Sequence, residues 1–228
     1  MRRLHPVSHH EQMLAQGEYV YLQNGEPAGL PETWELTLLP DGSRINRVEV
    51  GESIGLWHLM VAPDGRPDRL QVRLRDEVGR RFDATYTFFD QEVIVAAGQV
   101  GERPRRHFVE LPAGFGLVWV PFAGRDPVLM GCGPEVEGAQ SVMLYVISQE
   151  PREAGWLSGN SVACLVERRR RSMLEVPAGS FDAEEIVITI PGHPDQRGWF
   201  DRHGTVLQWQ VGGQTRAVLL HYRRFDVA

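Results

Sequence analysis

The sequence predicts an all-β protein whose antiparallel sheet curves into a half-barrel or open barrel, with an internal duplication and one short N-terminal helix. Three observations support this fold class. About fifteen segments have strand character, Asp-Gly turns separate several of them, and one ten-residue phrase occurs twice. A chain of 228 residues can form one β domain of this size with its own core.

The repeated phrase reads RRHFVELPAG at positions 105–114 and RRSMLEVPAG at positions 170–179. Each copy reads as a strand that stops at a Pro-Ala-Gly corner. An echo of this kind is typical of a duplicated structural unit. We therefore expect a single domain over residues 1–228, made of two related halves at about 18–130 and 139–228.

The short helix is expected over Ser8–Gln16. Ser8 and Glu11 have the spacing of a capping box, and Gly17 can end the helix in a left-handed conformation. Two turns of helix would form a lid or plug against the sheet, too little for a helical layer.

The hairpin turns follow. Pro40–Gly42 and Pro63–Gly65 contain Asp-Gly between alternating segments, and Asp201–Gly204 is a looser version. Apolar and polar residues alternate along Leu70–Arg75, which places one face on a core and the other in water. The run Phe115–Phe122 is apolar on both faces, as in a central strand or a strand whose second face contacts a ligand or partner.

Composition excludes several chemistries. The formal net charge is −6, and all 24 basic residues are Arg. With no Lys, the chain cannot form a lysine Schiff base or a normal Walker A site, and no cofactor is expected. The acidic balance gives no support for nucleic-acid binding. The N-terminus has no apolar segment behind its basic residues, so the sequence predicts a cytoplasmic protein without an integral membrane segment.

The second half carries a family resemblance. The order is a strand, Pro-Ala-Gly-Ser-Phe-Asp at 177–182, a strand, Trp-Phe-Asp-Arg-His-Gly at 199–204 and a further strand. This order resembles bacterial domains of unknown function related to half-barrel lipoprotein carriers and glycolipid-binding-like proteins, mainly over residues 170–210. The resemblance implies a curved antiparallel sheet around a helix, with an apolar hollow. Those carriers are usually exported, and the predicted absence of a leader departs from that pattern.

Aromatic residues are the main candidate ligand contacts. Large side chains of this kind either fill a wide β core or line an apolar hollow in a half-barrel. Our favoured hypothesis is a non-enzymatic binder of an apolar or amphipathic small molecule, as monomer or homodimer, with Arg or His at the rim of the hollow. The expected ligand-binding residues are Trp34, Trp57, Phe88, Trp119, Trp199 and Trp209.

Two alternatives stay open. One is a lipocalin-like hydratase, isomerase or cyclase, in which a carboxylate or histidine transfers a proton to a hydrophobic substrate. Its candidate acids and bases are His58, His107, Glu110 and Glu175, the last two at equivalent places in the repeat. The other is a structural or interaction protein that dimerises through an exposed sheet edge.

Other chemistries lack their motifs. The eight histidines include no His-x-His pair, and Cys132 and Cys164 stand alone, so no metal site is predicted. The two cysteines read as free thiols, although a bridge between them is open on parity. Arg168–Arg171 alternate between the two faces of a strand, which indicates a charged edge strand instead of a nucleic-acid surface.

Overall fold

The structure is a computed structural model that describes residues 9–51, 54–119, 121–132, 138–147 and 159–226. Within these ranges it holds seventeen strands and one short 3-10 helix, η1 (Phe122–Gly124), so the all-β prediction is confirmed. The strands before η1 are β1 (Gln12–Gln23), β2 (Glu26–Pro27), β3 (Glu32–Leu38), β4 (Arg44–Val50), β5 (Gly55–Val61), β6 (Pro67–Arg75), β7 (Arg81–Phe88), β8 (Glu92–Gln99), β9 (Arg105–Glu110) and β10 (Gly116–Trp119). Those after it are β11 (Gly138–Ile147), β12 (Gly159–Arg168), β13 (Ser172–Val176), β14 (Gly179–Thr189), β15 (Gln196–Phe200), β16 (Val206–Val211) and β17 (Gln214–Arg224).

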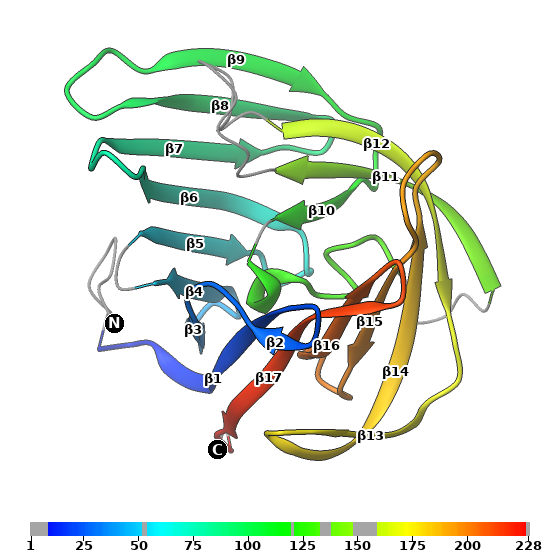
Figure 1. Cartoon of the computed structure of the whole chain (residues 1–228). Helices are drawn as coiled ribbons and strands as arrows, with labels where there is room; N and C mark the ends of the chain where they lie inside the picture. The colour runs from blue at the N-terminus through cyan, green and yellow to red at the C-terminus, as the bar shows by residue number, and fades with distance from the viewer. Residues whose placement is uncertain (1–8, 52–53, 120, 133–137, 148–158, 227–228) are drawn as a thin grey trace.

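The strands join in one curved sheet that does not close. β3 to β9 form an antiparallel meander, and β14 to β17 form a second one. β1 connects the two meanders because it pairs with both β3 and β17. β12 and β11 extend the second run, and β10 joins β11 in parallel. Among the described strands no ladder joins β9 to β10, so the open half-barrel is confirmed (Figure 1).

The predicted N-terminal helix is wrong. Ser8 lies outside the described residues, and the chain from Gln12 onward is the long strand β1. Gly17 lies inside this strand instead of ending a helix. A Cβ at that position would come within 2.6 Å of the His221 carbonyl oxygen and 2.8 Å of the Trp34 indole. Pairing with two neighbouring strands outweighs the local capping signal, because isolated short helices are marginal in water.

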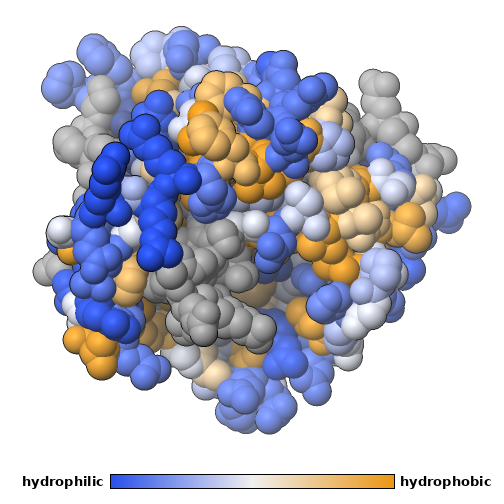
Figure 2. Space-filling model, turned by 90° about the horizontal axis from the view of Figure 1, so that it is seen from above, coloured by the Kyte–Doolittle hydropathy of each residue, from blue (hydrophilic) through white to orange (hydrophobic). Residues whose placement is uncertain are grey.

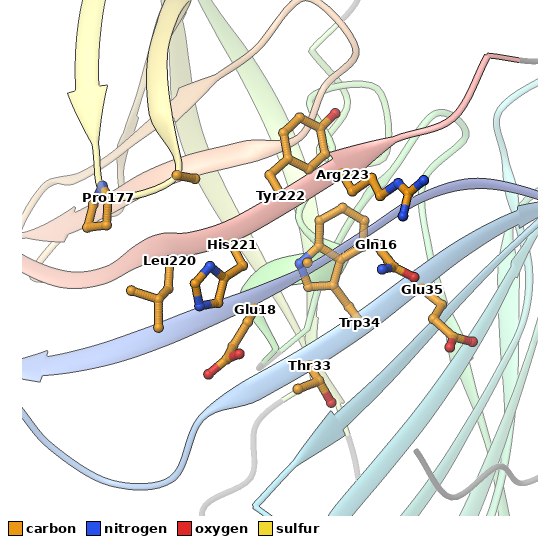
Figure 3. A pocket seen from close by; sticks show the side chains of 12 residues that line it. Gln16, Glu18, Thr33, Trp34, Glu35, Pro177, Leu220, His221, Tyr222 and Arg223 are labelled. Carbon is orange, nitrogen blue, oxygen red and sulfur yellow. The ribbon is translucent and has the colours of Figure 1, made fainter.

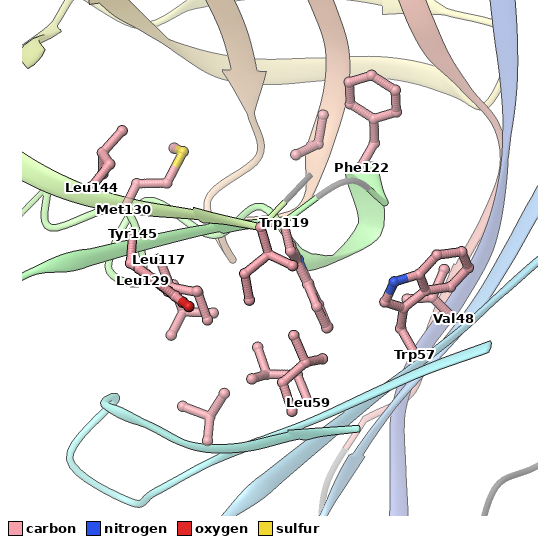
Figure 4. Packing of buried hydrophobic residues seen from close by; sticks show 14 of the residues in the cluster. Val48, Trp57, Leu59, Leu117, Trp119, Phe122, Leu129, Met130, Leu144 and Tyr145 are labelled. Atoms are coloured by element: carbon pink, nitrogen blue, oxygen red, sulfur yellow. The ribbon is translucent and has the colours of Figure 1, made fainter. Parts of the chain in front are cut away.

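The interior is filled by the segment that runs from β10 through η1 to Cys132. η1 lies between the two meanders in Figure 1 and contacts β4 and β16. Trp119, Phe122 and Met130 of this segment are buried, and the Trp119 ring points toward Leu59 across the half-barrel (Figure 4). The resemblance implied a helix inside the curved sheet. This irregular segment takes that place, and we call it the plug.

The sheet has an apolar inner face and a polar outer face. Leu70, Val72 and Leu74 are buried on the inner face, as their alternation predicts. The outer face of β3 and β4 buries an ion pair: Arg47 Nη1 lies 2.7 Å from Glu11 Oε2, with both side chains at most 3% exposed. Arg47 also donates to Thr37 Oγ1 at 3.0 Å, so charge is buried here with hydrogen-bond partners.

The two copies of the repeated phrase are used differently. β13 turns at Pro177 and Ala178 and pairs directly with β14. β9 pairs with β8, and its Pro-Ala-Gly corner leads away to β10. One core cluster contains residues from both predicted halves. The duplication and its boundaries stay predictions, since the shared phrase forms a hairpin in one copy and a corner in the other.

Candidate functional site

The six predicted ligand-binding aromatics do not gather around one hollow. Trp57, Trp119 and Trp209 are at most 2% exposed and belong to the core. Trp199 is partly buried and packs against that core. The remaining two also line hollows: Phe88 an open pocket at one end of the sheet, and Trp34 a surface groove and a small interior cavity.

The open pocket is lined by three chain connections, which lie at the same end of the strands in Figure 1. These are the β5–β6 turn, the β7–β8 turn and the Pro-Ala-Gly corner after β9. Its volume of about 900 Å³ is within the range of small-molecule sites. We call it the hairpin pocket; it is lined by Ala62, Arg66, Pro67, Asp68, Phe88, Phe89, Asp90, Gln91, Ala113, Gly114 and Phe115.

Three phenylalanines form the apolar part of the hairpin pocket. The rings of Phe88 and Phe115 pack with centroids 6.2 Å apart, and Phe88 also meets Tyr145 edge to face. Phe88 is therefore fixed from the core side. Phe89, the next residue, is 48% exposed. An aromatic ring left half open beside a hollow is a typical ligand contact, because a bound molecule would cover it.

The rim of the hairpin pocket is charged. Arg66 joins the two hairpin turns, since its side chain forms ion pairs with Asp64 in its own turn and with Asp90 in the other. The hydrogen bonds from Arg66 also hold the pKa of Asp64 below its usual value. Asp68 lines the pocket as well. Two carboxylates and one guanidinium on the lining leave a net negative rim, in which Arg66 is the basic side chain.

A second hollow, of about 500 Å³, crosses β1, β3 and β17. Figure 3 shows charged side chains, among them Glu18, Glu35 and Arg223, around the ring of Trp34. Trp34 is only 4% exposed. The groove therefore presents mixed charge and little apolar surface, and it suits an apolar ligand less well than the hairpin pocket does.

The third hollow is a small interior cavity beside η1, of about 40 Å³. Its surroundings are anchored by Glu32, a fully buried carboxylate on β3. Glu32 accepts hydrogen bonds from the Tyr21 hydroxyl (2.5 Å) and from the backbone N–H groups of Phe122 (3.0 Å) and Ala123 (2.6 Å). Burial raises the pKa of Glu32, while these three donors partly offset that effect. Glu32 thus fixes the plug to the sheet.

The proposed acids and bases lie apart. Glu110 and Glu175 are exposed on β9 and β13. His58 is buried on β5, and His107 is partly buried on β9 with its Nε2 buried and unpartnered. None of the four lines any of these three hollows. The geometry gives them no common substrate site.

Cysteine and metal chemistry find no support among the described residues. Cys132 and Cys164 are free and buried, and burial raises the pKa of their thiols to about 12 and about 11. Thiols with raised pKa values are poor nucleophiles at neutral pH. Over the same residues, no three His, Cys, Asp or Glu side chains come together as metal ligands would.

The arginine run, the apolar surface and the helix content of the described residues were also relevant to the predicted functions. Arg168, Arg169 and Arg171 form ion pairs with Glu184, Glu185 and Asp182 of β14, so these charges stabilise a strand pair. Apolar side chains form separate patches on the face seen from above (Figure 2). No helix in the described ranges has the length and apolar character needed to span a bilayer.

Sequence reasoning missed most of the hairpin pocket. It identified Phe88 and the turn at Pro63–Gly65, but not Phe89 or Arg66. One signal was present: the run beginning at Phe115 is apolar on both faces. Phe115 lines the pocket, whereas Leu117 and Trp119 two and four residues later enter the core.

Comparisons with known proteins support the fold but assign no function. No protein-family model and no curated protein matches the chain. A solved structure does match: the crystal structure of a β-barrel-like protein of the domain of unknown function DUF1849 from Brucella abortus. The TM-score is 0.55 at 11% identity, over 94% of this chain and 98% of that one. The barrel-like, curved β-sheet fold implied by the resemblance is confirmed.

Proposed function

We propose that the protein binds an apolar or amphipathic small molecule in the hairpin pocket and catalyses no reaction there. The carrying observation is Phe89, 48% exposed beside a hollow of about 900 Å³ whose floor is already built from Phe88 and Phe115. Fully burying an exposed phenylalanine side chain contributes roughly 1.5–3 kcal/mol, so covering the exposed half of Phe89 should contribute about half as much. The lining includes no histidine or cysteine, and of its two carboxylates Asp90 is paired with Arg66.

The rim charge sets the expected head group. Asp68 and Asp90 outnumber Arg66, and Arg66 already pairs with Asp64 and Asp90. An anionic head group would meet net repulsion, so a neutral or cationic end is favoured. The preference should be modest, because exposed charges are screened by water and salt.

The first test is displacement of the neutral fluorophore N-phenyl-1-naphthylamine by decanol, decylamine and decanoate, all with the same chain length. We expect saturable binding, with decylamine and decanol tighter than decanoate. Phe89→Ser should weaken fluorophore binding about tenfold, which corresponds to about 1.4 kcal/mol.

The matched control is Met173→Ser. Met173 is 69% exposed on β13 and lines none of the three hollows. Both variants remove an exposed apolar side chain, so a non-specific surface effect would weaken binding equally. Equal losses in the two variants, or binding that never saturates, would refute the pocket.

The edge strand β9 favours a second candidate, an interaction role through self-pairing. Among the described strands β9 pairs with β8 alone. Leu111 N–H donates to Gln91 O at 2.8 Å, so the backbone groups of Arg106, Phe108 and Glu110 point away from β8. In an antiparallel pair with a second copy centred on Phe108, each Arg106 would face Glu110 of the other copy.

Sedimentation equilibrium over a wide concentration range tests this candidate. We expect a concentration-dependent dimer that Arg106→Glu weakens and that the swap of Arg106→Glu with Glu110→Arg restores. Phe108, 68% exposed at the centre, should behave likewise when changed to Ser. A monomer mass at every concentration rules the dimer out and leaves the pocket proposal untouched.

A further inference from the structure

The interior cavity beside η1 contains an unusual concentration of unsatisfied polar groups. It is lined by the inner face of β3, β4 and β5, by the plug, and by the β15–β16 turn, where His203 is exposed to solvent. Its volume of about 40 Å³ exceeds the roughly 10–15 Å³ that one water needs. The lining residues are Trp34, Leu36, Arg44, Asn46, Leu59, Val61, Ala123, Arg125, Asp126, Leu129, His203, Gly204 and Thr205.

Arg125 is the central group of this cavity. Its guanidinium is held between two aromatic rings, 4.3 Å from the Phe122 centroid and 4.2 Å from that of Trp209. Its Nε and Nη1 are buried without a hydrogen-bond partner. Leaving buried donors of a charged group unpaired costs more than leaving neutral ones unpaired. Burial accordingly lowers the pKa of Arg125 to about 10, which still leaves it charged at neutral pH.

No carboxylate among the described residues accepts a hydrogen bond from Arg125 Nε or Nη1. Glu32 acts on Arg125 through space, but its two oxygens already accept three hydrogen bonds from Tyr21, Phe122 and Ala123. Asp126 lines the cavity, and its Oδ1 accepts from the backbone N–H of Val128 at 2.8 Å. Neither acid forms an ion pair with Arg125.

Asn46 supplies the complementary acceptor. Its Nδ2 donates to the Ala123 carbonyl at 2.6 Å, which fixes the orientation of the amide. Its Oδ1 is buried without a partner. The charged lining residues are Arg44 and Arg125 against Asp126, and partial desolvation and nearby arginines lower the pKa of His203 at the edge of the cavity. The cavity therefore combines net positive charge, free N–H donors and one free acceptor.

We propose that this cavity binds a small planar oxyanion of the size of formate or bicarbonate. The guanidinium of Arg125 would donate to the anion oxygens, a geometry that planar carboxylates match. Bicarbonate also carries an O–H that Asn46 Oδ1 can accept. The cavity is too small for the body of a lipid. It shares no lining residue with the hairpin pocket, so the two sites are separate.

The test uses sodium formate and sodium bicarbonate as probes against sodium chloride at constant ionic strength, with binding followed by ¹H–¹⁵N NMR. We expect saturable shifts of the Arg125 Nε–H resonance, with bicarbonate binding more tightly than formate. Asn46→Ala should reduce the bicarbonate preference, and Arg125→Gln should weaken both anions at least about tenfold. Arg73→Gln, on the outer face of β6, should change neither affinity.

The wild-type resonance keeps the proposal falsifiable even if Arg125→Gln does not fold. Non-saturating shifts with both anions, or a crystal structure at high formate concentration with only water beside Arg125, would overturn it. Phe89→Ser should leave anion binding intact, so failure of this site and failure of the hairpin pocket can be told apart.

Discussion

The interior of the half-barrel and the hairpin pocket differ in which groups lack contacts: polar atoms in the interior, and an aromatic ring in the pocket. In the interior, aromatic rings such as Trp119 and Trp209 are fully packed, while polar atoms of Arg125 and Asn46 lack partners. In the hairpin pocket, the polar groups of Arg66 are paired, while the ring of Phe89 is half open to solvent. Abundant aromatics therefore do not by themselves mark a ligand site. A hollow beside unpaired polar atoms suits a polar ligand, whereas a hollow beside an exposed aromatic ring suits an apolar one.

The largest effect should come from truncating a packed ring. Trp119 is 1% exposed and packs within the core cluster. We expect Trp119→Ala to lower the free energy of unfolding by about 3–5 kcal/mol, because it leaves a large cavity. Urea denaturation monitored by circular dichroism measures this. A loss below about 1 kcal/mol would mean that the interior is loosely packed and would weaken the contrast.

Replacing the carboxyl group of Glu32 by an amide should have an intermediate effect. Glu32→Gln places an amide where a carboxylate accepts two backbone N–H groups and the Tyr21 hydroxyl. We expect a loss of about 1–3 kcal/mol in the free energy of unfolding at pH 5. Thermal and urea unfolding of the two proteins give the difference.

The same pair of proteins has a predicted pH dependence. The folded pKa of Glu32 is raised above the usual 4.5, chiefly by burial. Between 4.5 and the raised value the folded state keeps a proton that the unfolded state has lost, so wild-type stability falls as pH rises through this window. Glu32→Gln lacks that contribution, and its disadvantage should shrink from pH 4.5 upward. A disadvantage that grows with pH would contradict the assigned direction.

The smallest effect on stability should come from the open ring. Phe89→Ser should change the free energy of unfolding by no more than about 0.5 kcal/mol, as for an ordinary surface substitution. The same change should weaken apolar ligand binding about tenfold. If Phe89→Ser destabilised the fold as strongly as Trp119→Ala, the ring would be structural and the pocket would lose its main contact.

The sequence predicted the sheet well because its signals are local. Alternation along Leu70–Arg75 and the Asp-Gly turns determine strands and hairpins without reference to distant residues. It failed at Ser8–Gln16, where a local capping pattern lies in a segment whose conformation is set by pairing with β3 and β17. The plug was equally hidden, since η1 is held by Glu32 from a distant strand.

The site was less predictable than the fold. Phe88 and Phe89 are adjacent and chemically identical, yet one is buried and the other exposed, because successive side chains near a strand end point to opposite sides. The unpaired atoms of Arg125 depend on the rings of Phe122 and Trp209, which tertiary packing alone places. The cytoplasmic location and the duplication stay predictions.

The most direct test of the central claim is an NMR titration of the labelled protein with decanol, mapped residue by residue. We predict saturable shifts in the backbone amides of Ala62–Asp68, Phe88–Gln91 and Ala113–Phe115, with no change at Trp119 or Trp209. Shifts concentrated in the interior or along the groove of β1 and β17, or no saturable shift at all, would contradict a ligand site in the hairpin pocket.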